Sequence, residues 1–93
     1  VEAARFPAMR QALAGEPIVC GTSTIAEGIA VKEPGRRTLG IVRALVDDIL
    51  LVDEDEIEAA VLLLLDLEKT VVEGAGAVGL AARAFGRRGV PAV

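Results

Sequence analysis

Apolar and polar residues follow a helical period along much of this 93-residue chain. The first such stretch covers residues 6–14, with Pro7 in its first turn and Gly15 after its last, which are favoured positions for these residues. A second helix should follow the turn sequence at residues 32–35, with Thr38 as its N-cap. The apolar positions that share one face of this helix are Val42, Leu45, Val46 and Ile49.

Two segments depart from this helical period. Residues 22–31 carry small side chains on both sides of Glu27 and Gly28, so we expect extended backbone with a tight turn at that pair. Residues 49–52 are four apolar residues in a row after two acids, which is typical of a short buried strand. Helices that alternate with short strands predict an α/β protein.

The longest predicted helix begins after Asp53 and extends to about Lys69. Asp53 with Glu56 three residues later is a capping-box arrangement, and acids in the first turn suit the positive end of the helix dipole. Its centre, residues 61–65, is apolar on every face, which indicates burial inside a larger protein. We expect glycines to end this helical pattern and a second helix to cover about residues 77–85.

The glycine-rich stretch between these two helices allows two interpretations. Gly74, Gly76 and Gly79 spell G-x-G-x-x-G, the fingerprint of dinucleotide-binding Rossmann folds, which would indicate an oxidoreductase. That fold needs a strand before the glycines, and residues 70–72 are too few for a typical one. The other interpretation is a glycine-broken junction between two helices, with the carboxylate of Glu73 at the break.

Composition narrows the classes of function that fit. The net charge is −4, from ten basic and fourteen acidic residues, which argues against a nucleic-acid partner. No apolar run is long enough to span a membrane. Cys20 has no second cysteine to pair with, so we expect a reducing, cytoplasmic location. Because the chain starts at Val1 and is 53% hydrophobic, we expect it to be a piece of a longer protein, with a strand beginning at Gly89.

Four segments, in this order, resemble the threonine dehydratases (threonine ammonia-lyases). They are TIAEGIAV with the KEPG that follows it, LVDDILLV, the acid-capped helix, and KTVVEGAGAVGLAA; the opening VEAARFPAM is also similar to the family. Serine racemases and serine dehydratases share much of this pattern. The resemblance implies that residues 1–93 are a fragment of a tryptophan-synthase-β-like catalytic domain, the fold of type II pyridoxal-phosphate enzymes, without its N-terminal and C-terminal parts.

The resemblance also implies a function for the longer parent. It would be a homo-oligomer that uses pyridoxal 5′-phosphate to eliminate ammonia from L-threonine, and from serine, as in isoleucine biosynthesis. The Schiff-base lysine of the family lies in an S-F-K-type motif that this chain lacks. Lys32 and Lys69 stand in other contexts, so we expect both to be solvated and the chain alone to be inactive.

Two family loops that line the cofactor ring match Glu27 with Gly28, and Glu73. We therefore expect these three residues to bind the cofactor, although the family usually has Asp at the position of Glu27. The alternative role for Glu73 is to cap the helix that follows it.

We expect no metal site. Some relatives hold a divalent cation through a Glu near the position of Glu2 and an Asp six residues later, where this chain has Ala8. The acidic run at residues 53–56 lacks the glycine and the spacing of a calcium loop, so we expect it to be a solvated helix start.

Overall fold

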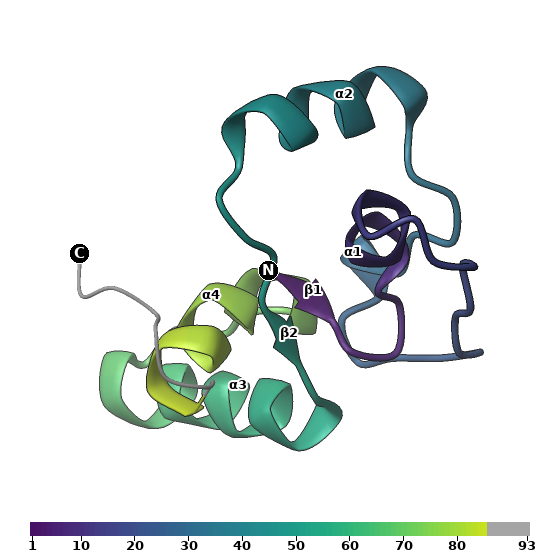
Figure 1. The fold of residues 1–93 in the computed structure, drawn as a ribbon. Helices are drawn as coiled ribbons and strands as arrows, with labels where there is room; N and C mark the ends of the chain where they lie inside the picture. Colours follow the sequence, from purple (N-terminus) through teal and green to yellow (C-terminus); the bar gives the residue numbers. More distant parts are fainter. Residues whose placement is uncertain (86–93) are drawn as a thin grey trace.

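The computed structural model describes residues 1–85 (Figure 1). In chain order its elements are β1 (Glu2–Ala3), α1 (Ala8–Leu13), the 3₁₀ helix η1 (Glu27–Ile29), α2 (Arg36–Leu45), β2 (Leu51–Val52), α3 (Glu54–Glu68) and α4 (Gly74–Phe85). This order confirms the α/β prediction. The strand expected from Gly89 lies outside the described residues.

The two strands pair in parallel at the centre of the molecule (Figure 1). Glu2 stands opposite Leu51, and Ala3 stands opposite Val52. The β2 strand confirms the second half of the predicted apolar strand. The β1 strand was not predicted, because two residues are too few to show a period of two.

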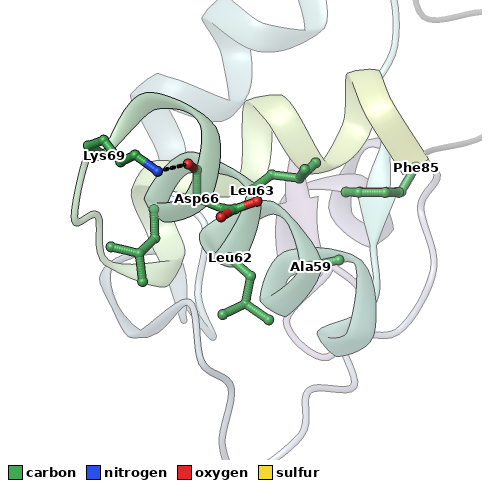
Figure 2. Close-up of a pocket in the computed structure, with 7 residues that line it drawn as sticks. Ala59, Leu62, Leu63, Asp66, Lys69 and Phe85 are labelled. Atoms are coloured by element: carbon green, nitrogen blue, oxygen red, sulfur yellow. Dashed lines mark hydrogen bonds between the residues drawn. The ribbon is translucent and has the colours of Figure 1, made fainter.

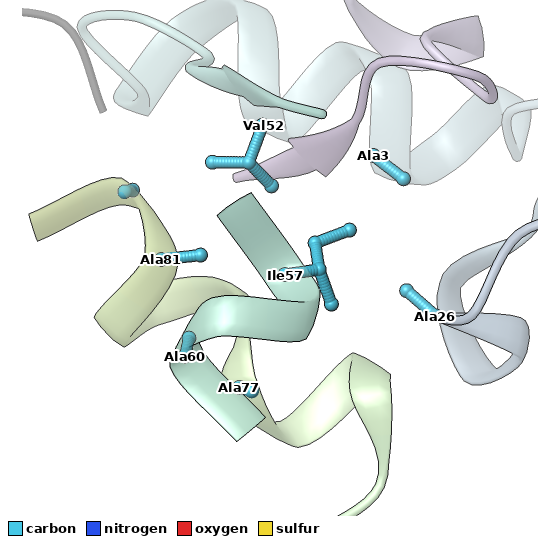
Figure 3. Packing of buried hydrophobic residues seen from close by; sticks show 8 residues of the cluster. Ala3, Ala26, Val52, Ile57, Ala60, Ala77 and Ala81 are labelled. Atoms are coloured by element: carbon cyan, nitrogen blue, oxygen red, sulfur yellow. The ribbon is translucent and has the colours of Figure 1, made fainter. Parts of the chain in front are cut away.

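The core lies where β2, α3 and α4 meet (Figure 3). Val52 and Ile57 are its largest fully buried side chains, and Ala60 of α3 faces Ala77 and Ala81 of α4. Alanines at this contact let the two helices approach closely. The packing therefore fixes the start of α4 relative to the strands.

The α3 helix begins and ends as predicted. The N–H of Glu56 donates to Asp53 Oδ1 at 2.8 Å, and the N–H of Asp53 donates to Glu56 Oε1 at 3.0 Å, which completes the capping box. At the other end Lys69 has a left-handed backbone with φ 54°, and the N–H of Thr70 donates to Leu64 O at 3.0 Å.

The predictions for α2 were wrong at both ends. Gly35, not Thr38, is the N-cap: its backbone is extended, and its carbonyl accepts the N–H of Leu39 at 2.8 Å. The helix therefore starts earlier than a cap by the Thr38 hydroxyl would allow. It ends at Leu45 because Val46 is extended, which leaves Ile49 outside the helix.

Two other predictions need correction in part. The tight turn predicted at Glu27 and Gly28 is present as a 3₁₀ helix, in which Ile29 N–H donates to Ala26 O at 3.1 Å, but residues 22–31 form no strand on either side of it. The α4 helix begins at Gly74, earlier than the predicted residue 77. Residues 70–73 form no strand, so the strand, turn and helix of a Rossmann motif are absent there.

Candidate functional site

The structure brings the two predicted cofactor loops together. The η1 helix, which contains Glu27 and Gly28, packs against α4, the helix that begins directly after Glu73. A Cβ placed on Gly28 would lie 3.0 Å from Ala75 Cβ and 3.4 Å from Glu73 Oε1. The glycine therefore permits a closer approach of the two loops than a larger residue would.

A second glycine controls the same junction from the other loop. A Cβ placed on Gly74 would overlap the carbonyl oxygen of Ile25 and lie 3.0 Å from the nitrogen of Ala26. Glycine alone avoids this overlap, so the first turn of α4 lies directly on the backbone that leads into η1. The buried side chain of Ala26 ties that backbone to the core.

Glu27 and Glu73 are both exposed, one on each loop. The backbone carbonyl of Glu73 accepts the N–H of Gly76 at 3.0 Å, while its carboxylate makes no hydrogen bond within residues 1–85. Within the described residues, the Glu73 carboxylate therefore does not cap α4 through a hydrogen bond. The site combines a bare glycine backbone with carboxylates that face solvent.

Glu54 contacts the segment that leads into η1, a role that the sequence did not predict. Its carboxylate accepts the Thr24 hydroxyl at Oε2 and the Ile25 N–H at Oε1, each at 2.7 Å. The prediction of a solvated helix start was therefore wrong for this residue, whose side chain is 20% exposed. No local pattern could indicate this role, because Thr24 lies 30 residues away in the chain.

Glu2, the residue considered as a metal ligand, caps α1. Its carboxylate accepts the N–H of Met9 at 3.0 Å and that of Arg10 at 2.9 Å. This contact satisfies donors at the start of a helix whose N-cap residue, Pro7, makes no side-chain cap. Within residues 1–85 no three His, Cys, Asp or Glu side chains gather where they could hold a metal ion.

The two lysines are exposed, as predicted. Lys32 lies in the loop before α2, and Lys69 follows α3 and donates from Nζ to the carbonyl of Asp66 at 2.5 Å (Figure 2). Neither lysine belongs to the two loops that meet at Gly28 and Gly74.

An apolar groove lies on α3, apart from these loops (Figure 2). Its volume is about 610 Å³, and its large apolar side chains come from Leu62, Leu63, Leu65 and Phe85. Leu62 is 56% exposed, so the central part of α3 is not enclosed within residues 1–85. The burial expected for it in a larger protein stays a prediction. No helix in the described part of the chain has the length and hydropathy to cross a membrane.

Comparison with known proteins places this arrangement in a family. Residues 1–92 match the family model described as "Pyridoxal-phosphate dependent enzyme". The L-threonine ammonia-lyase of Geobacter sulfurreducens is 57% identical over 61 residues, which are 66% of this chain and 15% of that protein. The solved T.th. threonine deaminase is similar with a TM-score of 0.79 and 36% identity, and the match covers 87% of this chain and 31% of the deaminase.

A maize serine racemase is similar with a TM-score of 0.76 and 37% identity, over 87% of this chain and 25% of the racemase. The chain spans about a sixth of the length of the curated relatives that it matches. Sequence and fold together confirm the resemblance to threonine dehydratases. The chain belongs to the pyridoxal-phosphate-dependent enzyme family, and its fold is that of part of the fold type II catalytic domain.

Proposed function

We propose that this chain is part of the catalytic domain of a longer pyridoxal-phosphate-dependent ammonia-lyase. That longer protein, named the full-length protein below, would convert L-threonine to 2-oxobutanoate and ammonia, and would act on L-serine as well. The observation that carries the proposal is the meeting of the Gly28 and Gly74 loops in a chain so similar to a threonine ammonia-lyase.

The residues at this junction fit one wall of a site for a flat cofactor ring. Gly28 presents backbone without a side chain, and Glu73 Oε1 lies beside the place where a Cβ would be. Backbone without a Cβ can approach a planar ring closely. We therefore propose that Glu27, Gly28 and Glu73 line the cofactor.

Charge indicates which part of the cofactor faces this wall. The carboxylates of Glu27 and Glu73 are acceptors that repel a phosphate and stabilise positive charge on a ring. We expect the ring, and not the phosphate, to lie against these loops. When bound, pyridoxal phosphate supplies the electron sink for the elimination, and the carboxylates of this chain supply fixed negative charge beside it.

The assay of the full-length protein with L-threonine and L-serine tests this function. We expect one 2-oxo acid and one ammonia for each amino acid consumed, and we expect both products to require pyridoxal phosphate. The similarity to a maize serine racemase makes racemisation the second candidate. Formation of D-serine from L-serine, without a 2-oxo acid from either substrate, would show that the protein is a racemase and not an ammonia-lyase.

We also propose that the full-length protein is a cytoplasmic homo-oligomer that acts on small amino acids and binds no nucleic acid. The lone Cys20 suits a reducing compartment, and the net charge of −4 disfavours a phosphate backbone. Its product from threonine would suit isoleucine biosynthesis. Light scattering on the purified full-length protein tests the oligomeric state.

A further inference from the structure

We infer that Glu54 is a positioning residue, which holds residues 24–28 in place and thereby sets the position of Gly28 at the cofactor wall. This inference rests on the proposed function, because that function assigns Gly28 and Glu27 to the cofactor. Within the described residues, the side-chain hydrogen bonds of Glu54 go to Thr24 and Ile25, and none goes to Gly28 or to Glu73. It acts through the segment that it holds.

Both oxygens of the Glu54 carboxylate are engaged by this segment. Oε2 accepts the Thr24 hydroxyl and Oε1 accepts the Ile25 N–H, each at 2.7 Å. The Thr24 oxygen in turn accepts the N–H of Ala26 at 3.1 Å, and Thr24 is only 7% exposed. Hydrogen bonds to an ionised acceptor are short and strong, and linked bonds strengthen one another.

Helix capping does not account for Glu54. Asp53 and Glu56 already complete the capping box of α3. Asp55 occupies the same first turn, is exposed, and provides an equivalent charge at the helix terminus. What distinguishes Glu54 from Asp55 is its pair of directed bonds to a distant segment.

The segment is held on two sides. Glu54, in the first turn of α3, holds Thr24 and Ile25, while Gly74, in the first turn of α4, lies against the carbonyl of Ile25. Arg5 adds a weaker contact: it donates to Ser23 O at 3.3 Å and lies 3.9 Å from Glu54 Oε1, with its side chain 54% exposed. The backbone that continues into η1 is therefore fixed before it reaches Gly28.

The test compares Glu54→Gln with Asp55→Asn in the full-length protein. The first readout is hydrogen exchange of a peptide that covers residues 22–31, measured without cofactor. Because a hydrogen bond to a charged group is worth about tenfold or more in an equilibrium, we expect Glu54→Gln to speed this exchange by about tenfold. The second readout is the dissociation constant of pyridoxal phosphate, which we expect to rise severalfold. Asp55→Asn should change neither quantity.

Thr24 variants keep the proposal testable if Glu54→Gln does not fold. Thr24→Val should speed the exchange, Thr24→Ser should leave it close to the original rate, and the Glu54→Gln/Thr24→Val double variant should show less than the product of the two single effects. Unchanged exchange in both Glu54→Gln and Thr24→Val would overturn the inference. Faster exchange with unchanged cofactor affinity would overturn the cofactor role of residues 24–28, and with it that part of the proposed function. If the full-length protein without any substitution has no ammonia-lyase activity, that result would contradict the proposed function alone.

Discussion

The first turn of α4 lies directly on the carbonyl group of Ile25 at Gly74, where a Cβ would lie 2.7 Å from the carbonyl carbon. Backbone thus packs against backbone between two segments that are distant in the chain. The glycine is required by this contact, and not by a break in the helix, because Gly74 is itself the first residue of α4. Any side chain at this position has to displace one of the two loops.

The first prediction compares two glycines of α4 in the full-length protein. Gly74→Ala should lower the melting temperature by several degrees, because forcing atoms into a packed contact costs about 1–3 kcal/mol. Gly79→Ala is the matched control: a Cβ there meets nothing within 4 Å, and alanine favours a helix interior by up to about 1 kcal/mol. Equal melting temperatures for the two variants would contradict the backbone contact.

The second prediction concerns the approach of Gly28 to Ala75. In Gly28→Ala the new Cβ would lie 3.0 Å from that of Ala75, so one loop must move by a few tenths of an ångström. We expect a severalfold rise in the dissociation constant of pyridoxal phosphate. The double variant Gly28→Ala/Ala75→Gly removes the opposing methyl group and should recover most of the affinity. If it recovers none, the effect of Gly28→Ala has a cause other than this contact.

The local features of the fold could be predicted from sequence. The capping box of Asp53 and Glu56 and the end of α3 near Lys69 follow from residues within one turn of each other. The start of α2 could not, because Thr38 and Gly35 both suit an N-cap, and only the extended backbone at Gly35 decides between them.

The candidate site depended on contacts between distant segments. The resemblance to threonine dehydratases selected Glu27, Gly28 and Glu73, but no periodicity shows that Gly74 meets Ile25. The hydrogen bond between Thr24 and Glu54 could not be predicted either, because it also joins distant segments. An acid in the first turn of a helix is equally well explained by the helix dipole.

The third prediction separates two roles of Glu73 in the full-length protein. A carboxylate that lines the cofactor supplies negative charge to the reaction, so Glu73→Gln should lower kcat by about tenfold or more, which is about 1.4 kcal/mol on the barrier. The melting temperature should stay nearly unchanged. Steady-state kinetics and thermal melts decide the matter. A normal kcat with a lower melting temperature would assign Glu73 to capping α4.

The fourth prediction tests the capping box of α3. Asp53→Ala removes the acceptor of the Glu56 N–H and should cost about 1 kcal/mol of stability. Glu58→Gln is the control, because Glu58 is exposed on the same helix beyond its first turn. Thermal melts of the full-length protein measure both variants. Since α3 carries Glu54, Asp53→Ala should also speed exchange in residues 22–31, although less than Glu54→Gln does.

The last prediction concerns the apolar groove on α3. We expect the 93-residue chain alone to turn over no threonine, because neither Lys32 nor Lys69 lies at the candidate site. We also expect it to bind an apolar dye, because Leu62 and Leu65 line an open groove. Leu62→Gln should reduce dye binding by the isolated chain.

In the full-length protein we expect the same groove to be covered. Leu62→Gln should then destabilise that protein by about 2–5 kcal/mol, the range for loss of a buried leucine side chain. Leu67→Gln is the matched control, because Leu67 is also on α3, is 69% exposed, and does not line the groove. Thermal melts of the two full-length variants give the comparison. If Leu62→Gln melts at the same temperature as Leu67→Gln, the groove is open to solvent in the full-length protein. The prediction that another segment buries the apolar centre of α3 would then be wrong.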